Sequence, residues 1–151
     1  MTPADLDLDL DLDLAELREL HPAELILECV GIRHAPPYDP AALDELRAAT
    51  ARLRAAPDPL AATRADEDFH RALAARCADP RVVEAIVSLQ LKLRPYTRAY
   101  LAEATHVERA ADQHEAIVGA LADGDHAAAE QRLRRYRVAS LSALVAQLSA
   151  T

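Results

Sequence analysis

The sequence predicts an all-α protein, an antiparallel bundle of six to seven helices, and three observations support this fold class. Hydrophobic residues make up 51% of the 151 residues but aromatic residues only 3%, so aliphatic side chains must build the core. The chain has only 3 Gly, while Ala, Leu, Glu and Arg, which favour helices, are abundant. Apolar residues recur at three- and four-residue steps between segments that contain proline.

The N-terminal segment is a low-complexity run in which Asp and Leu alternate over residues 5–14. Strict alternation is the period of a strand, but Asp is a poor strand former and neighbouring acids repel one another. We therefore divide the chain into an acidic tail, residues 1–14, and a single helical domain, residues 15–151. The tail is either a mobile segment that joins the first helix or a row of leucines that docks on a partner.

Prolines and aspartates mark the ends of the first three expected helices. Pro22 suits a first turn, and Pro36-Pro37 ends the helix that follows it. Asp39-Pro40 predicts the N-cap and first turn of a second helix, which Pro57-Asp58-Pro59 ends. A third helix is expected from about Ala61 to Ala78. The buried faces of these helices are expected to contain Leu25, Ile26, Cys29, Val30, Leu43, Leu46, Ala49, Leu53, Phe69, Leu73 and Cys77.

Three more helices are expected in the second half of the chain. Asp79-Pro80 starts the fourth, and Pro95 predicts a kink or break in it because an internal proline removes a helical hydrogen bond. The fifth is expected over about Val107 to Leu121, followed by Asp123-Gly124-Asp125, in which Gly124 suits a left-handed conformation and Asp125 an N-cap. The sixth is expected over about His126 to Leu148. Short connections between these helices predict antiparallel neighbours.

Charge and composition argue against several functional classes. The net charge of −8 disfavours direct binding to nucleic acid, which requires a basic surface. The densest basic cluster is interpreted as a solvated helix face and contains Arg132, Arg134, Arg135 and Arg137. No apolar run approaches the ~20 residues of a membrane span. Because the two cysteines form no CxxC pair, we expect a cytoplasmic protein with reduced, buried thiols.

Three polar residues on two expected helices predict an internal site. Asp66 and His70 are four residues apart and so project from one face of a helix. His114 lies on another helix among the apolar residues Ala110, Ala111, Ile117 and Val118. One carboxylate and two imidazoles suit Zn, Ni, Mn or Fe and leave positions for water or a ligand's carboxylate. The alternatives are a surface Asp–His pair and a core histidine with its own hydrogen-bond partner.

A second feature of the sequence is the pair Arg94 and Arg98, one helical turn apart beside Pro95. Two guanidinium groups so placed can bind an anionic ligand bidentately, and the alternative is a pair of exposed arginines. No serine has a base at a diagnostic spacing, and the chain has no Gly-rich phosphate loop. The sequence therefore favours ligand binding over nucleophilic catalysis.

Three motifs occur in order along the chain: Asp66-x-x-Phe69-His70, then Asp79-Pro80, then His114-x-x-Ile117-x-x-Ala120-x-x-x-Gly124-Asp125-x-x-x-Ala129. Together they resemble the FCD domain, the effector-binding C-terminal half of FadR-type GntR transcription regulators, over roughly residues 22–148. The resemblance implies an antiparallel helical bundle with an internal cavity for small organic acids. In many members of the family, one Asp and three His hold a divalent metal in that cavity.

Carried over to this chain, the resemblance assigns Asp66, His70 and His114 as metal ligands. Tyr136 stands where the family has its fourth ligand, a His, and a phenol with a pKa of about 10 is a weak ligand at neutral pH. Three outcomes stay open: three ligands with water or effector, a site completed by Tyr136 as ligand or hydrogen-bond donor, or a metal-free polar pocket. Arg94, Arg98 and Tyr136 are the expected ligand-binding residues.

Regulators of this family carry a winged helix-turn-helix before the FCD domain, and this chain has only the Asp-Leu tail in that place. We therefore expect a free-standing effector-binding domain that forms a homodimer and binds a small carboxylate-bearing molecule. It is expected to act in transcription regulation only through a partner, without direct contact to nucleic acid or membrane. The alternatives are an enzyme that uses the same cavity for acid–base or metal-assisted chemistry, and a protein that only pairs with a full-length regulator.

Overall fold

The structure is a computed structural model that describes residues 13–150. This part of the chain forms six helices: α2 (Leu14–Arg33), α3 (Pro40–Arg54), α4 (Pro59–Ala74), α5 (Pro80–Tyr100), α6 (Ala104–Ala122) and α7 (His126–Ser149). No strand occurs within these residues, so the all-α prediction is confirmed. The expected Asp-Leu tail lies outside the described residues except for its last two positions.

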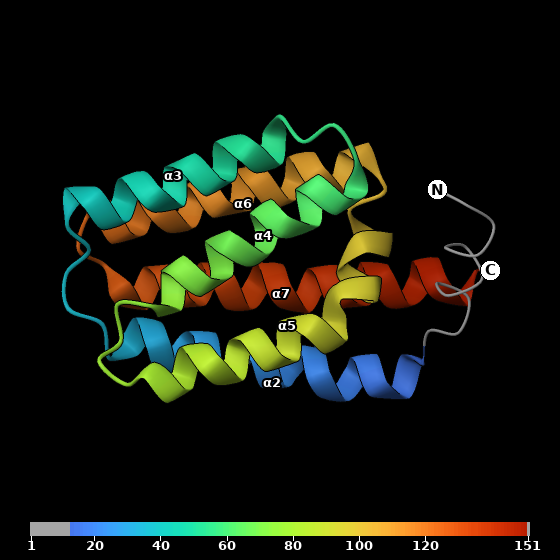
Figure 1. The fold of residues 1–151 in the computed structure, drawn as a ribbon, viewed down its shortest axis with the longest axis horizontal. Helices are drawn as coiled ribbons and strands as arrows, with labels where there is room; N and C mark the ends of the chain where they lie inside the picture. Colours follow the sequence, from blue (N-terminus) through green and yellow to red (C-terminus); the bar gives the residue numbers. More distant parts are fainter. Residues whose placement is uncertain (1–12, 151) are drawn as a thin grey trace.

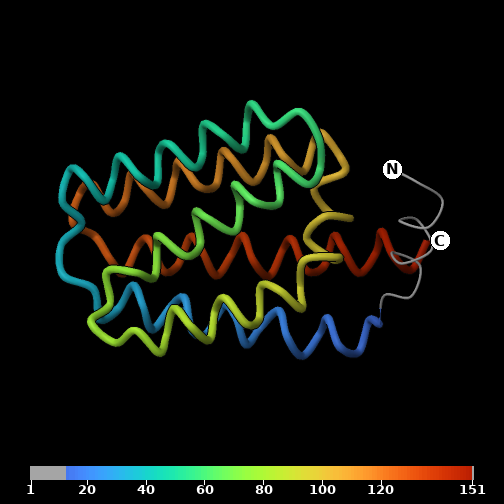
Figure 2. The backbone as a smooth tube through the Cα atoms, in the orientation of Figure 1, coloured from blue at the N-terminus to red at the C-terminus, as the bar shows by residue number. Residues whose placement is uncertain are grey.

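Successive helices run in opposite directions along the long axis of the bundle, so each is antiparallel to the next (Figure 2). α3 and α6 lie side by side along one edge of the bundle, and α2 and α5 lie along the opposite edge (Figure 1). α4 and α7 run between these two pairs (Figure 1). Side chains from α2, α4, α6 and α7 therefore reach the same interior. Over residues 13–150 no helix is long and apolar enough to cross a membrane.

Aspartate side chains cap the N-termini of five of these helices. In each case a carboxylate oxygen accepts a hydrogen bond from a backbone amide of the first turn; the caps are Asp13, Asp39, Asp58, Asp79 and Asp125. Each such cap typically stabilises a helix by about 1 kcal/mol. Gly124 adopts a φ of 73° between α6 and α7, so the predicted left-handed turn is confirmed.

The interpretation of Pro22 is wrong. Pro22 does not begin a helix, because α2 starts earlier, at Leu14, and contains Pro22 in its interior. α2 contacts α4, α5 and α7, and burial against three neighbours outweighs the single helical hydrogen bond that a proline removes. Pro95 lies within α5, which continues to Tyr100 but bends sharply towards its C-terminal end (Figure 2), so the helix has a kink and not a break.

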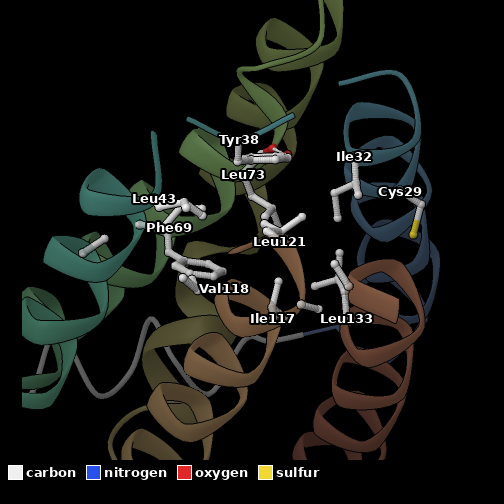
Figure 3. Close-up of a cluster of buried hydrophobic side chains, with 14 of the residues drawn as sticks. Cys29, Ile32, Tyr38, Leu43, Phe69, Leu73, Ile117, Val118, Leu121 and Leu133 are labelled. Carbon is white, nitrogen blue, oxygen red and sulfur yellow. Dashed lines mark hydrogen bonds between the residues drawn. The ribbon is translucent and has the colours of Figure 1, made fainter. Parts of the chain in front are cut away.

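Two buried apolar clusters form the core. The cluster in Figure 3 gathers Phe69 and Leu73 of α4, Ile117 and Leu121 of α6, and Leu133 of α7. The other cluster includes Leu17 of α2, Ala65 of α4, Ala110 and Ala111 of α6, and Tyr136 of α7. On α2, α4, α6 and α7 alike, one part of the helix contributes to one cluster and another part to the other. The polar site described below lies on these helices where the two clusters meet.

Three residues expected on the buried faces are not buried: Val30 and Cys77 are half-buried, and Ile26 is exposed. Ile26 is 59% exposed, because the inner face of α2 is formed by Leu17, Leu25, Glu28 and Ile32 instead. Cys77 is only half-buried, since α4 ends at Ala74 and Cys77 lies in the turn that follows. Cys29 is buried as expected, and both thiols are free.

Gly31 marks a close approach of α2 to α4. A Cβ at this position would lie 2.9 Å from both Cα and Cβ of Ala74. Because a contact with backbone cannot be relieved by a rotamer change, we expect Gly31→Ala to lower the free energy of unfolding by about 1–3 kcal/mol. This is opposite to the gain of up to about 1 kcal/mol that alanine normally brings within a helix.

Urea denaturation of Gly31→Ala beside Gly119→Ala measures this effect. Gly119 lies within α6 and has nothing within 4 Å of the added Cβ, so its substitution should leave stability unchanged or raise it. If Gly31→Ala is as stable as Gly119→Ala, the two helices do not depend on this close contact.

Candidate metal site

α4 and α6 bring Asp66, His70 and His114 together in the bundle interior. All three side chains are buried, and one ligand atom from each lies within 4.8 Å of the others. Asp66 Oδ1 is 3.4 Å from His70 Nε2 and 3.3 Å from His114 Nε2. The four-residue spacing on α4 thus places the carboxylate and the first imidazole on one face, and α6 supplies the second imidazole opposite.

The ring of Phe69 lies against both imidazole rings. Its ring is stacked on that of His114, with the centroids 3.8 Å apart and an angle of 2° between the planes. The same phenyl ring meets His70 edge-on at 5.5 Å. Because Phe69 is fully buried on α4 between the two ligands of that helix, the packing of the core restricts the rotation of His114.

The donor atoms fit a divalent cation. Both ring nitrogens of His70 and of His114 lack a partner in hydrogen-bond geometry, although buried polar atoms nearly always have one. Two ligand atoms that bind one zinc ion at about 2.0–2.1 Å in a tetrahedron lie roughly 3.3 Å apart. The two O–N separations in this group, 3.3 and 3.4 Å, match that value.

Glu28 of α2 is a buried neighbour of this group that sequence reasoning missed. Its Oε1 lies 2.6 Å from His70 Nδ1, on the side of the ring away from Asp66, and the residue is 0% exposed. A signal for it was present in the sequence: His21, Glu24 and Glu28 continue the three- and four-residue steps that start at Leu17. Polar side chains at successive inner positions of one helix indicate a polar interior.

Burial and charge have opposite effects on the two α4 groups. Burial lowers the pKa of His70, but the carboxylates of Glu28 and Asp66 outweigh it and raise the pKa to about 10. Burial raises the pKa of Asp66, but the charge of His70 and the contacts with both imidazoles hold it well below its usual range. Burial lowers the pKa of His114. Without a metal, the centre therefore contains a charged His70 beside a neutral His114.

Tyr136 of α7 lies beside the group but is not part of it. The centroids of the Tyr136 and His114 rings are 6.1 Å apart, and the rings are nearly perpendicular. Burial, followed by the charge of Asp66, raises the pKa of Tyr136 well above its usual value. The phenol therefore stays protonated at neutral pH, which suits a hydrogen-bond donor better than a metal ligand.

A small internal cavity adjoins the centre. Its volume is about 30 Å³, and its lining includes Asp66, His70, Tyr136, His21, Tyr100 and Arg137. A volume of this size holds one or two water molecules, whereas pockets for drug-sized ligands measure about 300–1,000 Å³. Burial, together with the charges of Arg137 and His70, lowers the pKa of His21 to about 2, so this imidazole is neutral.

Arg137 is the arginine that lines this cavity. The prediction of a solvated face is wrong for Arg137, which is buried and forms an ion pair with Glu24 of α2, itself buried. Its Nε has no hydrogen-bond partner. The expected binding residue Arg94 instead donates hydrogen bonds of 3.0 and 2.9 Å to the carboxylate of Glu67. Neither Arg94 nor Arg98 is among the residues that line the cavity.

Comparisons with known proteins agree with this architecture. The family model of the FCD domain matches residues 13–139. A solved structure from Rhodococcus sp. RHA1, described as a GntR transcriptional regulator, has the same fold, with a TM-score of 0.78 and 23% sequence identity. The alignment covers 89% of this chain and 66% of that chain, so this chain spans somewhat less than two thirds of its length. No curated protein matches the sequence. Because the family model covers most of the sequence, the chain belongs to the FCD domain family, the effector-binding domains of GntR-type regulators.

Proposed function

We propose that this FCD domain binds a divalent metal through Asp66, His70 and His114, and a small carboxylate-bearing effector beside it. The observation that carries the proposal is the buried group of three donors whose imidazole nitrogens have no hydrogen-bond partner. A bound divalent cation, such as Zn²⁺, Ni²⁺, Mn²⁺ or Fe²⁺, can take one nitrogen of each imidazole and one oxygen of Asp66, and it offers an open position to a ligand's carboxylate.

The effector is proposed to bind to side chains that line the cavity. Tyr100, Tyr136 and Arg137 line the cavity, Arg137 Nε has no hydrogen-bond partner, and the Tyr136 phenol is protonated at neutral pH. These N–H and O–H groups can donate to a carboxylate. An organic acid is larger than the present cavity of about 30 Å³, so its binding requires the lining side chains to move outward.

The proposal extends to the cellular role. The domain acts in transcription regulation by passing its ligand state to a DNA-binding partner, and it does so as a cytoplasmic homodimer. A ligand can shift the bundle between two conformations only if it binds them with different affinities. The cavity provides this difference, because the ligand fits the opened conformation and not the closed one.

Thermal unfolding of metal-stripped protein tests the metal site. A cation present at a hundred times its Kd should stabilise the native state by about 2.7 kcal/mol, which corresponds to roughly 5–10 °C in Tm for a chain of this length. His114→Ala should lose this shift. His34→Ala, which removes an exposed histidine at the end of α2, should keep it. A wild-type protein whose Tm responds to none of these cations contradicts the metal site.

A second arm of the experiment adds small organic acids with and without the metal. A further rise in Tm that requires the metal supports the complete proposal. A rise in the metal-free protein instead supports a polar pocket that needs no metal. No response to any acid in either form contradicts the effector site.

A further inference from the structure

We propose that Glu28 is a positioning residue of the metal centre, which accepts a hydrogen bond from His70 Nδ1–H and directs Nε2 at the metal. This inference rests on the metal site proposed above. It concerns how the imidazole ring is held, and it assigns a role to a carboxylate outside the three-residue group.

The geometry places Glu28 and Asp66 at opposite nitrogens of one imidazole. Glu28 Oε1 is 2.6 Å from His70 Nδ1, while Asp66 Oδ1 is 3.4 Å from His70 Nε2. The ligand atoms that lie together are those of Asp66, His70 and His114, and Glu28 is not among them. Glu28 therefore cannot share the same ion in this arrangement, but it can fix which nitrogen His70 offers.

Glu28 has no competing partner. Both carboxylate oxygens are buried and lack a partner in hydrogen-bond geometry, and Glu28 Oε1 is 2.6 Å from His70 Nδ1, close to the separation of about 2.7–2.9 Å in charge-assisted N–H···O hydrogen bonds. The proposed bond therefore requires the Nδ1–H of His70 to turn toward this oxygen. The residue is 0% exposed on the inner face of α2, between Leu25 and Ile32. A carboxylate is expensive at such a position unless it is paired.

Metal-binding histidines usually donate their second N–H to a carboxylate, a carbonyl or water, which fixes the tautomer and the ring orientation. In this chain the two histidines are held differently. The ring of His114 is held by stacking on Phe69, whereas His70 meets Phe69 only edge-on and has Glu28 at its Nδ1. Glu28 thus ties the α4 imidazole to α2, and the centre depends on three helices rather than two.

The test measures Zn²⁺ affinity by competition with a chromogenic chelator. Glu28→Ala should weaken Zn²⁺ binding about 10- to 100-fold, the usual effect of removing such a supporting carboxylate. Glu28→Gln keeps a carbonyl oxygen that can accept from Nδ1–H, so it should recover most of the affinity. Glu24→Gln is the control: Glu24 lies one turn earlier on α2 and pairs with Arg137, so its loss should lower stability without weakening Zn²⁺ binding.

A spectroscopic measurement separates positioning from a general effect on folding. In Co²⁺-substituted protein, the N–H protons of coordinated histidines give strongly shifted NMR signals that vanish when they exchange with water. The His70 signal should exchange faster with water in Glu28→Ala than in the wild type and in Glu28→Gln, while the exchange of the His114 signal is the same in all three.

The outcomes are distinct. Wild-type Zn²⁺ affinity in Glu28→Ala, or an equal change in the exchange of both histidine signals in it, overturns the assignment of Glu28 alone. If Glu28→Ala does not fold, a Glu28→Gln variant that binds Zn²⁺ as weakly as His114→Ala also overturns it. Failure of the wild type to bind Zn²⁺ or Co²⁺ overturns the proposed function, and the Glu28 assignment with it.

Discussion

Arg137→Met is expected to lower the free energy of unfolding by about 3–5 kcal/mol, because it leaves Glu24 as a buried carboxylate without its partner. The pair joins α7 to α2, and both side chains are almost completely buried. Burial and the adjacent Glu28 both raise the pKa of Glu24, and Arg137 opposes them. The guanidinium therefore offsets part of the cost of burying the Glu24 carboxylate.

Urea denaturation of a double-mutant cycle measures the effect. Glu24→Leu combined with Arg137→Met should be far more stable than Arg137→Met alone, since apolar residues can replace a buried ion pair at little cost. Arg54→Met is the surface control: Arg54 pairs with exposed Asp112 and Glu115, and its loss should leave the unfolding midpoint nearly unchanged. If the double variant is no more stable than Arg137→Met, the loss does not come from an unpaired Glu24.

Phe69→Ala is expected to cost about 3–5 kcal/mol of stability as well, because it opens a cavity in the centre of the core. Phe69 is 0% exposed and belongs to the cluster of Figure 3. The same substitution removes the ring on which His114 is stacked. Zn²⁺ affinity should therefore fall together with stability.

Phe69→Leu separates the two effects. Leucine fills most of the space, so its stability loss should be smaller than that of alanine, but it offers no aromatic face to His114. Thermal unfolding of the metal-free variants and Zn²⁺ competition measure the two quantities. Equal stability of the leucine and alanine variants contradicts the cavity argument, and wild-type Zn²⁺ affinity in both contradicts a role of Phe69 in holding His114.

Local patterns were sufficient to predict much of this structure. The caps at Asp39, Asp79 and Asp125 and the turn at Gly124 depend on hydrogen bonds within a few residues, and the structure has them all. The four-residue step from Asp66 to His70 likewise needs only helical geometry. The resemblance to the FCD domain, which implies the fold, rests on such motifs in their order. The division into a tail and one domain, and the assignment of a ligand to the site, stay predictions.

Local patterns could not predict contacts between helices that are distant in the sequence. Glu24 and Arg137 are 113 residues apart, and each by itself resembles the exposed charges around it. Their burial is decided by the packing of α2 against α7. Arg94 pairs with Glu67 of the preceding helix, and the sequence predicts that these helices are neighbours but not the register that brings the two side chains together.

The division of the core by a polar layer has a consequence for cooperativity. Each apolar cluster is a unit of buried contacts, and units of this kind can open locally with different free energies. Asp66, His70 and His114 lie on the helices where these units meet. A ligand bound there contacts elements of both units. With the ligand bound, the two clusters are therefore expected to open together and not one by one. Such a domain can report a small molecule through the rigidity of its whole length, without any large displacement of a helix.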